Sequence, residues 1–322
     1  MPIERMSRIQ QREAVSVVIP CLPGAPLPEA LAALKALPEA EKALISEVWV
    51  VRGRNPSRQR NCAAQKAGGD WLWFLDDDAR PRPGTLSVLL EAAKAFSAGA
   101  AGGPNVAPAD ETPLGTRLDA VLTSPMGSGI SRARYTSVGK RRLAGEKELI
   151  LCNFLVQRQA FLGLGGFCEE LFPNEENEFL NRWNAAGFLA VYEPAATVER
   201  PRRGSVGAFA LQAFRYGRGR AQQVRRSFRA GDLVNLAALG LPCLWAGCLA
   251  AQAWGGGTAA LGRWVPLAYA GAAFLSAGLR PSVAIFLILR HHAYAAGLAV
   301  GCFQEARVAP GEPSVERLSG WE

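Results

Sequence analysis

Short apolar runs recur through the first two hundred residues and predict the strands of a sheet. The runs at 15–20, 47–51 and 70–75 are rich in valine, isoleucine and tryptophan and contain few polar residues, which is typical of strands buried on both faces. Further runs of this kind lie at 149–156 and 189–192. We interpret all of these runs as strands of one buried sheet.

Amphipathic stretches separate the first strands. The spacing of apolar residues predicts helices at 27–37, 61–67 and 85–96. Strands that alternate with helices form the β-α-β-α-β unit that binds nucleotides in many proteins. We therefore expect an α/β fold in which a mostly parallel sheet is flanked by helices.

A cluster of acidic residues follows the strand at 70–75. Asp76, Asp77 and Asp78 are consecutive, and Pro81 comes shortly after them. Carboxylates this close repel one another unless a cation lies among them, and oxygen ligands suit Mg²⁺ or Mn²⁺. The cluster therefore predicts a metal site that could hold a diphosphate at the edge of the sheet; the alternative is a solvated acidic turn.

A second acidic cluster begins an expected helix at 173–183. Glu175, Glu176 and Glu178 lie in its first turn, where acidic residues stabilise a helix through its dipole. The functional alternative is that one of them is a general base. This stretch alone leaves both explanations open.

Two segments are expected to be loops. Residues 52–60 are basic and follow the second strand. Residues 102–147 are rich in glycine, proline, serine and arginine, and so long a stretch without clear periodicity is usually functional. We expect this segment to close over a substrate.

Positive charge is concentrated in one part of the chain. Residues 200–231 contain nine arginines and no acidic residue, so without them the formal net charge would fall from +8 to −1. Few aromatic residues are interspersed and a long apolar region follows, which favours membrane-surface phosphates over nucleic acid as the partner. The seven cysteines show no metal-ligand spacing and indicate reduced thiols in a cytosol-facing protein.

The C-terminal third is apolar enough to enter a membrane. Residues 233–262 contain no charged side chain, and a helix over 233–254 would be about 33 Å long, enough to cross a bilayer core. The run at 264–279 is short for a membrane span. The run at 282–303 is long enough but contains Arg290-His291-His292, so we expect this helix to face other helices, a polar cavity or the interface.

We expect two or three membrane helices, with a helical soluble domain as the alternative. The positive-inside rule predicts that the N-terminal domain faces the cytoplasm, at the cytoplasmic (inner) membrane. The charged N-terminus lacks the apolar segment of a signal peptide.

These observations divide the chain into consecutive parts. The expected boundaries are an N-terminal tail (1–14), a nucleotide-sugar-binding domain (15–199), a basic interfacial segment (200–232), a membrane region (233–303) and a C-terminal tail (304–322).

Several motifs, taken in order, resemble the family-2 glycosyltransferases. They are the opening strand at 15–20, an Asp-x-Asp turn at Asp76 and Asp78, the acidic pair at 175–176, and Gln-x-x-Arg-Tyr at 212–216, where related synthases have Trp in the last position. The resemblance covers residues 15 to about 230. It implies an inverting enzyme with a GT-A type α/β domain that binds a nucleotide sugar.

Further motifs are similar to those of membrane-attached transferases of the succinoglycan glucosyltransferase type. These are Ser-Pro-x-Gly-x-Gly at 124–129, Asn-Glu-Glu at 174–176, Tyr-Gly-Arg-Gly-Arg-Ala at 216–221, and the pair His291 and Tyr294. Each motif is short, and their order along one chain carries the resemblance.

The resemblance implies a role for particular residues. Asp78, with Asp76, would hold Mg²⁺ or Mn²⁺ against the donor diphosphate, and Glu176, with Glu175 as the alternative, would be the general base. Arg218 and Arg220 would meet acceptor or lipid phosphates, or would instead form part of a solvated basic surface. The implied donor-binding residues are Pro20, Asn61, Asp76, Asp77, Gln212, Arg215 and Tyr216.

The chain departs from the family pattern in two places. The family usually ends its second strand with an Asp that holds the nucleotide base, but here the strand leads into Arg52-Gly53-Arg54, so a UDP donor is an expectation from the resemblance alone. Glu176 replaces the usual Asp, which lengthens the proposed base by one methylene group.

The function expected from the sequence is an inverting transfer of a sugar from a nucleotide donor to a polyprenyl-linked saccharide in cell-surface polysaccharide synthesis. The alternatives are a polyprenyl-phosphate glycosyltransferase or a nucleotidyltransferase on a similar sheet. A catalytically inactive, membrane-bound nucleotide-binding scaffold is an alternative from a different class.

Overall fold

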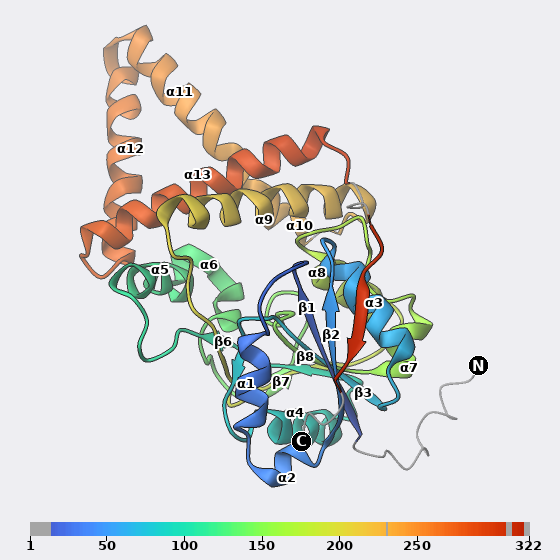
Figure 1. Cartoon of the computed structure of the whole chain (residues 1–322). Helices are drawn as coiled ribbons and strands as arrows, with labels where there is room; N and C mark the ends of the chain where they lie inside the picture. Colours follow the sequence, from blue (N-terminus) through green and yellow to red (C-terminus); the bar gives the residue numbers. More distant parts are fainter. Residues whose placement is uncertain (1–13, 230, 307–310, 319–322) are drawn as a thin grey trace.

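The computed structural model describes residues 14–229, 231–306 and 311–318. An α/β domain forms the lower part of the molecule in Figure 1, and a group of long helices from the C-terminal third lies above it. The expected tail at 1–14 lies, except for residue 14, outside the described residues.

An eight-stranded sheet forms the centre of the α/β domain. Its middle strands β2, β1 and β3 are parallel, β8 runs against β3, and β5 and β9 run with β3. The expected α/β fold with a mostly parallel sheet is therefore confirmed, with antiparallel strands at both edges and at β8. In spatial order the strands are β11 (Ser314–Arg317), β2 (Ile45–Arg52), β1 (Val15–Cys21), β3 (Trp71–Leu75), β8 (Asn153–Gln157), β5 (Ala100–Gly102), β9 (Ala190–Tyr192) and β7 (Arg142–Leu143).

A small second sheet lies beside the end of β3. It has three short strands, with β10 between β4 and β6. Because β4 follows the acidic turn directly, this sheet holds the turn against the segment that begins after β10. The strands are β4 (Arg80–Pro81), β6 (Asn105–Val106) and β10 (Val198–Glu199).

Helices cover both faces of the main sheet because its strands are apolar on both faces. In β3, Trp71, Trp73 and Leu75 belong to one core, whereas Leu72 and Phe74 belong to the other, as the two-residue repeat of a strand requires. Helices α1, α4 and α5 contribute to the first core, and α3, α7 and α8 to the second. The helices are α1 (Glu29–Lys35), α2 (Glu39–Lys42), α3 (Pro56–Lys66), α4 (Thr85–Ala95), α5 (Pro113–Thr123), α6 (Pro125–Ser128), α7 (Arg158–Gly163) and α8 (Glu175–Ala185).

The expected loops are shorter than the sequence indicated. Helix α3 begins at Pro56 rather than near residue 61, because the Asn55 side chain accepts a hydrogen bond from the Arg58 amide and proline suits the first helical position. The expectation of one long loop at 102–147 was wrong: this segment contains β6, α5, α6, a 3₁₀ helix at Gly129–Arg134 and β7. Capping by Thr112 and Ser124 explains the helices there.

The C-terminal third is helical. Helices α9 and α13 lie side by side above the main sheet, and α11 and α12 extend away from it as a hairpin (Figure 1). Glycines allow α9 and α13 to approach closely: a Cβ atom on Gly217 would lie 2.1 Å from the Tyr294 carbonyl oxygen, and one on Gly297 would lie 1.9 Å from that of Phe214. The helices are α9 (Val206–Arg226), α10 (Asp232–Leu236), a 3₁₀ turn (Ala237–Leu239), α11 (Gly240–Trp254), α12 (Gly256–Ser276) and α13 (Pro281–Phe303).

Two segments among the described residues are long and apolar enough to cross a membrane, Asp232–Trp254 and Pro281–Phe303. The two segments differ in environment. In the apolar 18-residue stretch of each, 6% is buried in the first segment and 33% in the second. The second segment is α13, which faces α9, as its internal charges led us to expect. Part of the expected C-terminal tail forms β11 and pairs with β2.

Candidate active site

The acidic turn after β3 is held by two arginines from distant parts of the chain. Arg60 of α3 lies with Nη2 2.7 Å from Oδ1 of Asp76. Arg200, which follows β10, lies with Nη1 2.8 Å from Oδ2 of Asp76 and with Nε 2.7 Å from Oδ1 of Asp78. Burial opposes ionisation of Asp76, but the charges of Arg200 and Arg60 hold its pKa below the ordinary value.

The central carboxylate of the turn has a different environment. Burial, followed by the negative charges of Asp78 and Asp76, raises the pKa of Asp77. Among the ion pairs of the described residues, none involves Asp77. A cation beside this turn would relieve the repulsion that raises the pKa.

The carboxylate groups of the turn are therefore suitable ligands for a divalent cation. Its oxygen atoms are the type that Mg²⁺ and Mn²⁺ prefer. The guanidinium of Arg200, however, lies between Asp76 and Asp78. The described residues contain no group of three or more His, Cys, Asp and Glu side chains placed to hold a metal. Metal binding by Asp76 and Asp78 stays a prediction that requires Arg200 to move.

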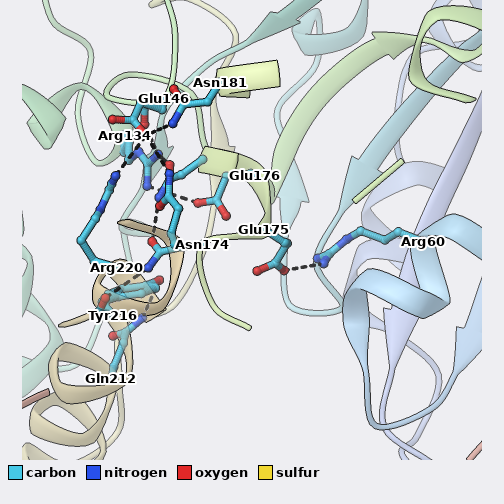
Figure 2. Close-up of polar contacts among 12 residues, drawn as sticks. Arg60, Arg134, Glu146, Asn174, Glu175, Glu176, Asn181, Gln212, Tyr216 and Arg220 are labelled. Carbon is cyan, nitrogen blue, oxygen red and sulfur yellow. Dashed lines mark hydrogen bonds and ion pairs between the residues drawn. The ribbon is translucent and has the colours of Figure 1, made fainter. Parts of the chain in front are cut away.

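Glu175 and Glu176 begin α8 and point to different partners (Figure 2). Glu175 is 3% exposed, and its Oε1 lies 3.3 Å from Nη1 of Arg60, while its Oε2 is buried without a hydrogen-bond partner. Burial, followed by the charge of Glu176, raises the pKa of Glu175 to about 8. Arg60 does not prevent this shift, since its shorter contact is with Asp76.

Glu176 lies on the other side of this helix start. Its Oε1 is 3.3 Å from Nη1 of Arg134, which comes from the 3₁₀ helix after α6. Arg134 also donates hydrogen bonds to the Glu146 carbonyl oxygen and to Asn177. Arg134 therefore links the Glu176 carboxylate at the start of α8 to the segment that follows α6.

One cavity of about 470 Å³ brings the two acidic clusters together. We call it the first cavity; residues 76, 77, 175 and 176 line it, together with a wall from α9. Among the residues singled out from the sequence, the cavity is lined by Pro20, Asp76, Asp77, Glu175, Glu176, Gln212, Arg215 and Tyr216.

Four of the predicted site residues do not line the first cavity: Asn61, Asp78, Arg218 and Arg220. The amide group of Asn61 donates to the Phe167 carbonyl and accepts from the Phe167 amide, so it fixes the loop before α8. Arg218 and Arg220, both predicted to meet acceptor or lipid phosphates, lie on different sides of α9, because residues two apart in a helix are rotated by about 200°. Arg218 lines a separate cavity of about 200 Å³.

The Tyr-Gly-Arg-Gly-Arg motif places α9 against its neighbours. Gly217 faces α13, and a Cβ atom on Gly219 would lie 2.4 Å from the Pro173 carbonyl oxygen, just before α8. Asn174 donates a hydrogen bond to the Tyr216 carbonyl oxygen at 3.2 Å. The two glycines therefore let one helix contact both α8 and α13, and Tyr216 lines the first cavity together with Glu176.

Comparison with known proteins adds to this geometry. Residues 29–163 match the family described as Glycosyl transferase family 2. This part of the chain is therefore similar to the family 2 glycosyltransferases. The match includes the acidic turn, while the glutamates at 175 and 176 follow it in the sequence.

Two curated relatives are similar to part of the chain. The chain is 33% identical over 172 residues to the succinoglycan biosynthesis protein ExoM of Rhizobium meliloti (strain 1021), covering 51% of each chain. It is 28% identical over 150 residues to the N-acetylglucosaminyl-diphospho-decaprenol L-rhamnosyltransferase of Mycobacterium tuberculosis (strain ATCC 25618 / H37Rv), covering 43% of this chain and 49% of the relative. The chain thus spans about half the length of the curated relatives it matches. The resemblance to family 2 and to succinoglycan biosynthesis proteins is confirmed.

A solved structure shares the fold over most of the chain. The mannosyltransferase PcManGT from Pyrobaculum calidifontis, in complex with GDP-Man and Mn²⁺, superposes with a TM-score of 0.55 at 19% identity, covering 89% of this chain and 86% of the other. The shared fold therefore extends from the α/β domain into the C-terminal helices.

The sequence did not identify three arginines of the site. Arg60, Arg134 and Arg200 each contact one of the acidic residues. The only signal was their position in basic stretches that were interpreted as loops or as a membrane-surface segment. No local pattern distinguishes an arginine that pairs with a buried carboxylate from one that faces solvent.

Proposed function

We propose that this chain is an inverting glycosyltransferase that transfers a sugar from a nucleotide-sugar donor to a polyprenyl-linked saccharide during cell-surface polysaccharide assembly. The observation that carries this proposal is the first cavity, where Asp76 and Asp77 share one space with Glu175 and Glu176. The names of the relatives support it, since one refers to succinoglycan biosynthesis and one to a diphospho-decaprenol acceptor.

The donor diphosphate would bind beside the acidic turn. Arg203 and Arg215 line the first cavity, and neither forms an ion pair within the described part of the chain, so both are free to bind phosphate oxygens. Mg²⁺ or Mn²⁺, when bound by Asp76 and Asp78, would stabilise the negative charge of the departing nucleotide. A nucleotide-sugar donor is supported by the complex of the structural neighbour, which contains GDP-Man; UDP stays an expectation from the sequence.

Glu176 is the proposed general base. It would accept the proton of the acceptor hydroxyl while that oxygen attacks the anomeric carbon opposite the leaving diphosphate, which inverts this carbon. The pKa of about 8 means that Glu175 largely keeps its proton at neutral pH, so we assign it a structural role beside Arg60. Glu175 remains the alternative base.

The proposed site of action is the cytoplasmic membrane. The α11–α12 hairpin exposes large apolar side chains, including Leu249 (67% exposed) and Trp254 (88% exposed), as expected for a membrane-inserted element. The exposed Arg225 and Arg226 at the end of α9 would then face anionic lipid headgroups on the cytoplasmic side.

A pair of matched variants tests the base assignment. Glu176→Gln removes the proposed base and should lower the rate of sugar transfer by about 10²-fold or more, with donor affinity unchanged. Glu175→Gln replaces a protonated carboxyl group with an amide of the same shape and should keep most of the activity. Wild-type turnover in Glu176→Gln would contradict the assignment, and loss of turnover in Glu175→Gln alone would favour Glu175.

Product analysis tests the reaction class. Purified protein should release nucleoside diphosphate from a nucleotide sugar, and removal of divalent cations with EDTA should abolish this release until Mn²⁺ is restored. Release of inorganic pyrophosphate would instead indicate a nucleotidyltransferase. Donor binding without any release would support the scaffold alternative.

A further inference from the structure

A second, larger cavity lies between the α/β domain and the C-terminal helices. It has a volume of about 590 Å³, within the range of ligand-binding pockets. Its walls come from α6 and the 3₁₀ helix after it, from α9, from the segment 234–244 and from α13. We call it the second cavity; it is not part of the site described above, although Tyr216 lines both.

One side of the second cavity is basic. Arg134, Arg220 and Arg290 line it together with His291, and no acidic residue is among its lining residues. The first two arginines already have carboxylate partners, Glu176 for Arg134 and Glu146 and Asp232 for Arg220. None of these acidic partners lines the second cavity, so its lining keeps a positive character.

Arg290 differs from the other two arginines. Its Nε donates a hydrogen bond to the Gly127 carbonyl oxygen at 2.9 Å, which fixes the guanidinium at the wall. Within the described residues it has no carboxylate partner. Nε2 of His291 lies 2.9 Å from the Met126 carbonyl oxygen, so the same segment of chain positions both side chains. An immobilised guanidinium without a counter-ion is suited to bind an anion.

Two further polar atoms in the wall lack partners. Ser128 Oγ and Arg134 Nε are both buried and have no hydrogen bond within the described residues. A buried polar group without a partner is costly, and a ligand that draws either side chain toward the cavity would relieve this cost. Both atoms belong to residues that line the second cavity.

The other side of the second cavity is apolar and continues toward the expected membrane. Ala237, Ala238, Leu241 and Leu244 line it, and they lead into α11. Leu244 is 41% exposed, so the apolar side is open rather than closed by protein. A ligand that is anionic at one end and a long hydrocarbon at the other matches this arrangement.

We propose that the second cavity binds the diphosphate and the first isoprene units of a polyprenyl-diphosphate acceptor, with Arg290, His291 and Ser128 at the diphosphate and the α11 side chains at the lipid. This inference rests on the proposed function and adds the place where the acceptor binds. Arg134 lines the second cavity and lies 3.3 Å from the Glu176 carboxylate, which lines the first. A sugar attached to the diphosphate is thereby directed at Glu176.

Binding measurements on the full chain in lipid nanodiscs test the anionic half of this site, with farnesyl diphosphate as the probe. Arg290→Gln should weaken farnesyl diphosphate binding about tenfold or more, as loss of a charged hydrogen-bond donor predicts. Arg290→Lys should restore part of the affinity. The matched control Arg225→Gln, on the exposed end of α9, should bind as the wild type does. Equal affinities for Arg290→Gln and the wild type, or an equal loss in Arg225→Gln, would overturn the proposal.

The apolar half is tested with a second pair of variants and a second probe. Leu244→Gln should weaken farnesyl diphosphate severalfold and leave inorganic diphosphate unchanged, while Leu249→Gln on the same helix, outside the cavity, should change neither. If inorganic diphosphate binds the wild type as tightly as farnesyl diphosphate does, the lipid assignment is wrong. Nucleotide-sugar binding, measured in parallel, should be the same in all variants. If the wild type does not bind nucleotide sugars but still binds farnesyl diphosphate in an Arg290-dependent manner, the proposed function is refuted and the proposed acceptor site is not.

Discussion

Replacing Glu175 with glutamine should stabilise the protein at neutral and alkaline pH. The carboxyl group is 3% exposed, and burial together with the charge of Glu176 raises its pKa from 4.5 to about 8. An unfolded chain loses this proton near pH 4.5, whereas the folded protein keeps it until about pH 8. Between these values the folded state binds more protons, so its stability falls as pH rises.

The size of the effect follows from the shift. Each pKa unit corresponds to about 1.4 kcal/mol, so the rise of the pKa from 4.5 to about 8 makes the cost of Glu175 to the folded protein reach on the order of 5 kcal/mol above pH 8. Glu175→Gln cannot ionise and escapes this cost, and its hydrogen bond from Arg60 can be kept by the amide oxygen. For a domain of this size, the difference amounts to a Tm gain of about 10 °C.

Thermal unfolding in detergent between pH 5 and pH 9 provides the assay. The Tm of Glu175→Gln minus that of the wild type should be small at pH 5 and should grow up to about pH 8. Glu178→Gln on the same helix, which breaks an ion pair with Arg182, should show no such gain. Parallel Tm curves for Glu175→Gln and the wild type would show that Glu175 is ionised in the folded protein, and the argument that leaves Glu176 as the base would fail.

Two other substitutions test what holds the site together. Arg60→Gln removes one of the two arginines paired with Asp76, together with the hydrogen bond to the protonated Glu175, and should cost about 3 kcal/mol. Arg58→Gln on the same helix breaks more exposed ion pairs and should cost at most about 1 kcal/mol; similar Tm values for the two variants would contradict the bridging role. Gly297→Leu should separate α13 from α9, since a Cβ atom there would lie 1.9 Å from a backbone oxygen, while Gly271→Leu on α12 has open space around it. Limited proteolysis should therefore cleave the 281–303 region faster in Gly297→Leu only.

Much of the fold could be predicted because its signals are local. The strands at 71–75 and 15–21 are apolar on both faces, and only a central position in a sheet covered by helices on both sides satisfies such a run. The start of α3 was missed because capping by Asn55 and Pro56 outweighs the basic character of the following residues. The segment at 102–147 was misjudged because its short helices depend on caps and tertiary packing rather than on a long apolar period.

The sequence by itself determined the α/β class, the two acidic clusters, the basic segment and the apolar C-terminal helices, since each follows from neighbouring residues and their periodicity. Only the tertiary structure decided which charges meet. Arg60 pairs with Glu175 across 115 positions, and Arg200 pairs with Asp78 across 122. It also decided that Arg218 and Arg220 face different cavities and that Arg290 lies with the 126–128 segment in a second one. The physical reason is that contacts over such separations depend on how whole elements pack, and local composition carries no record of that packing.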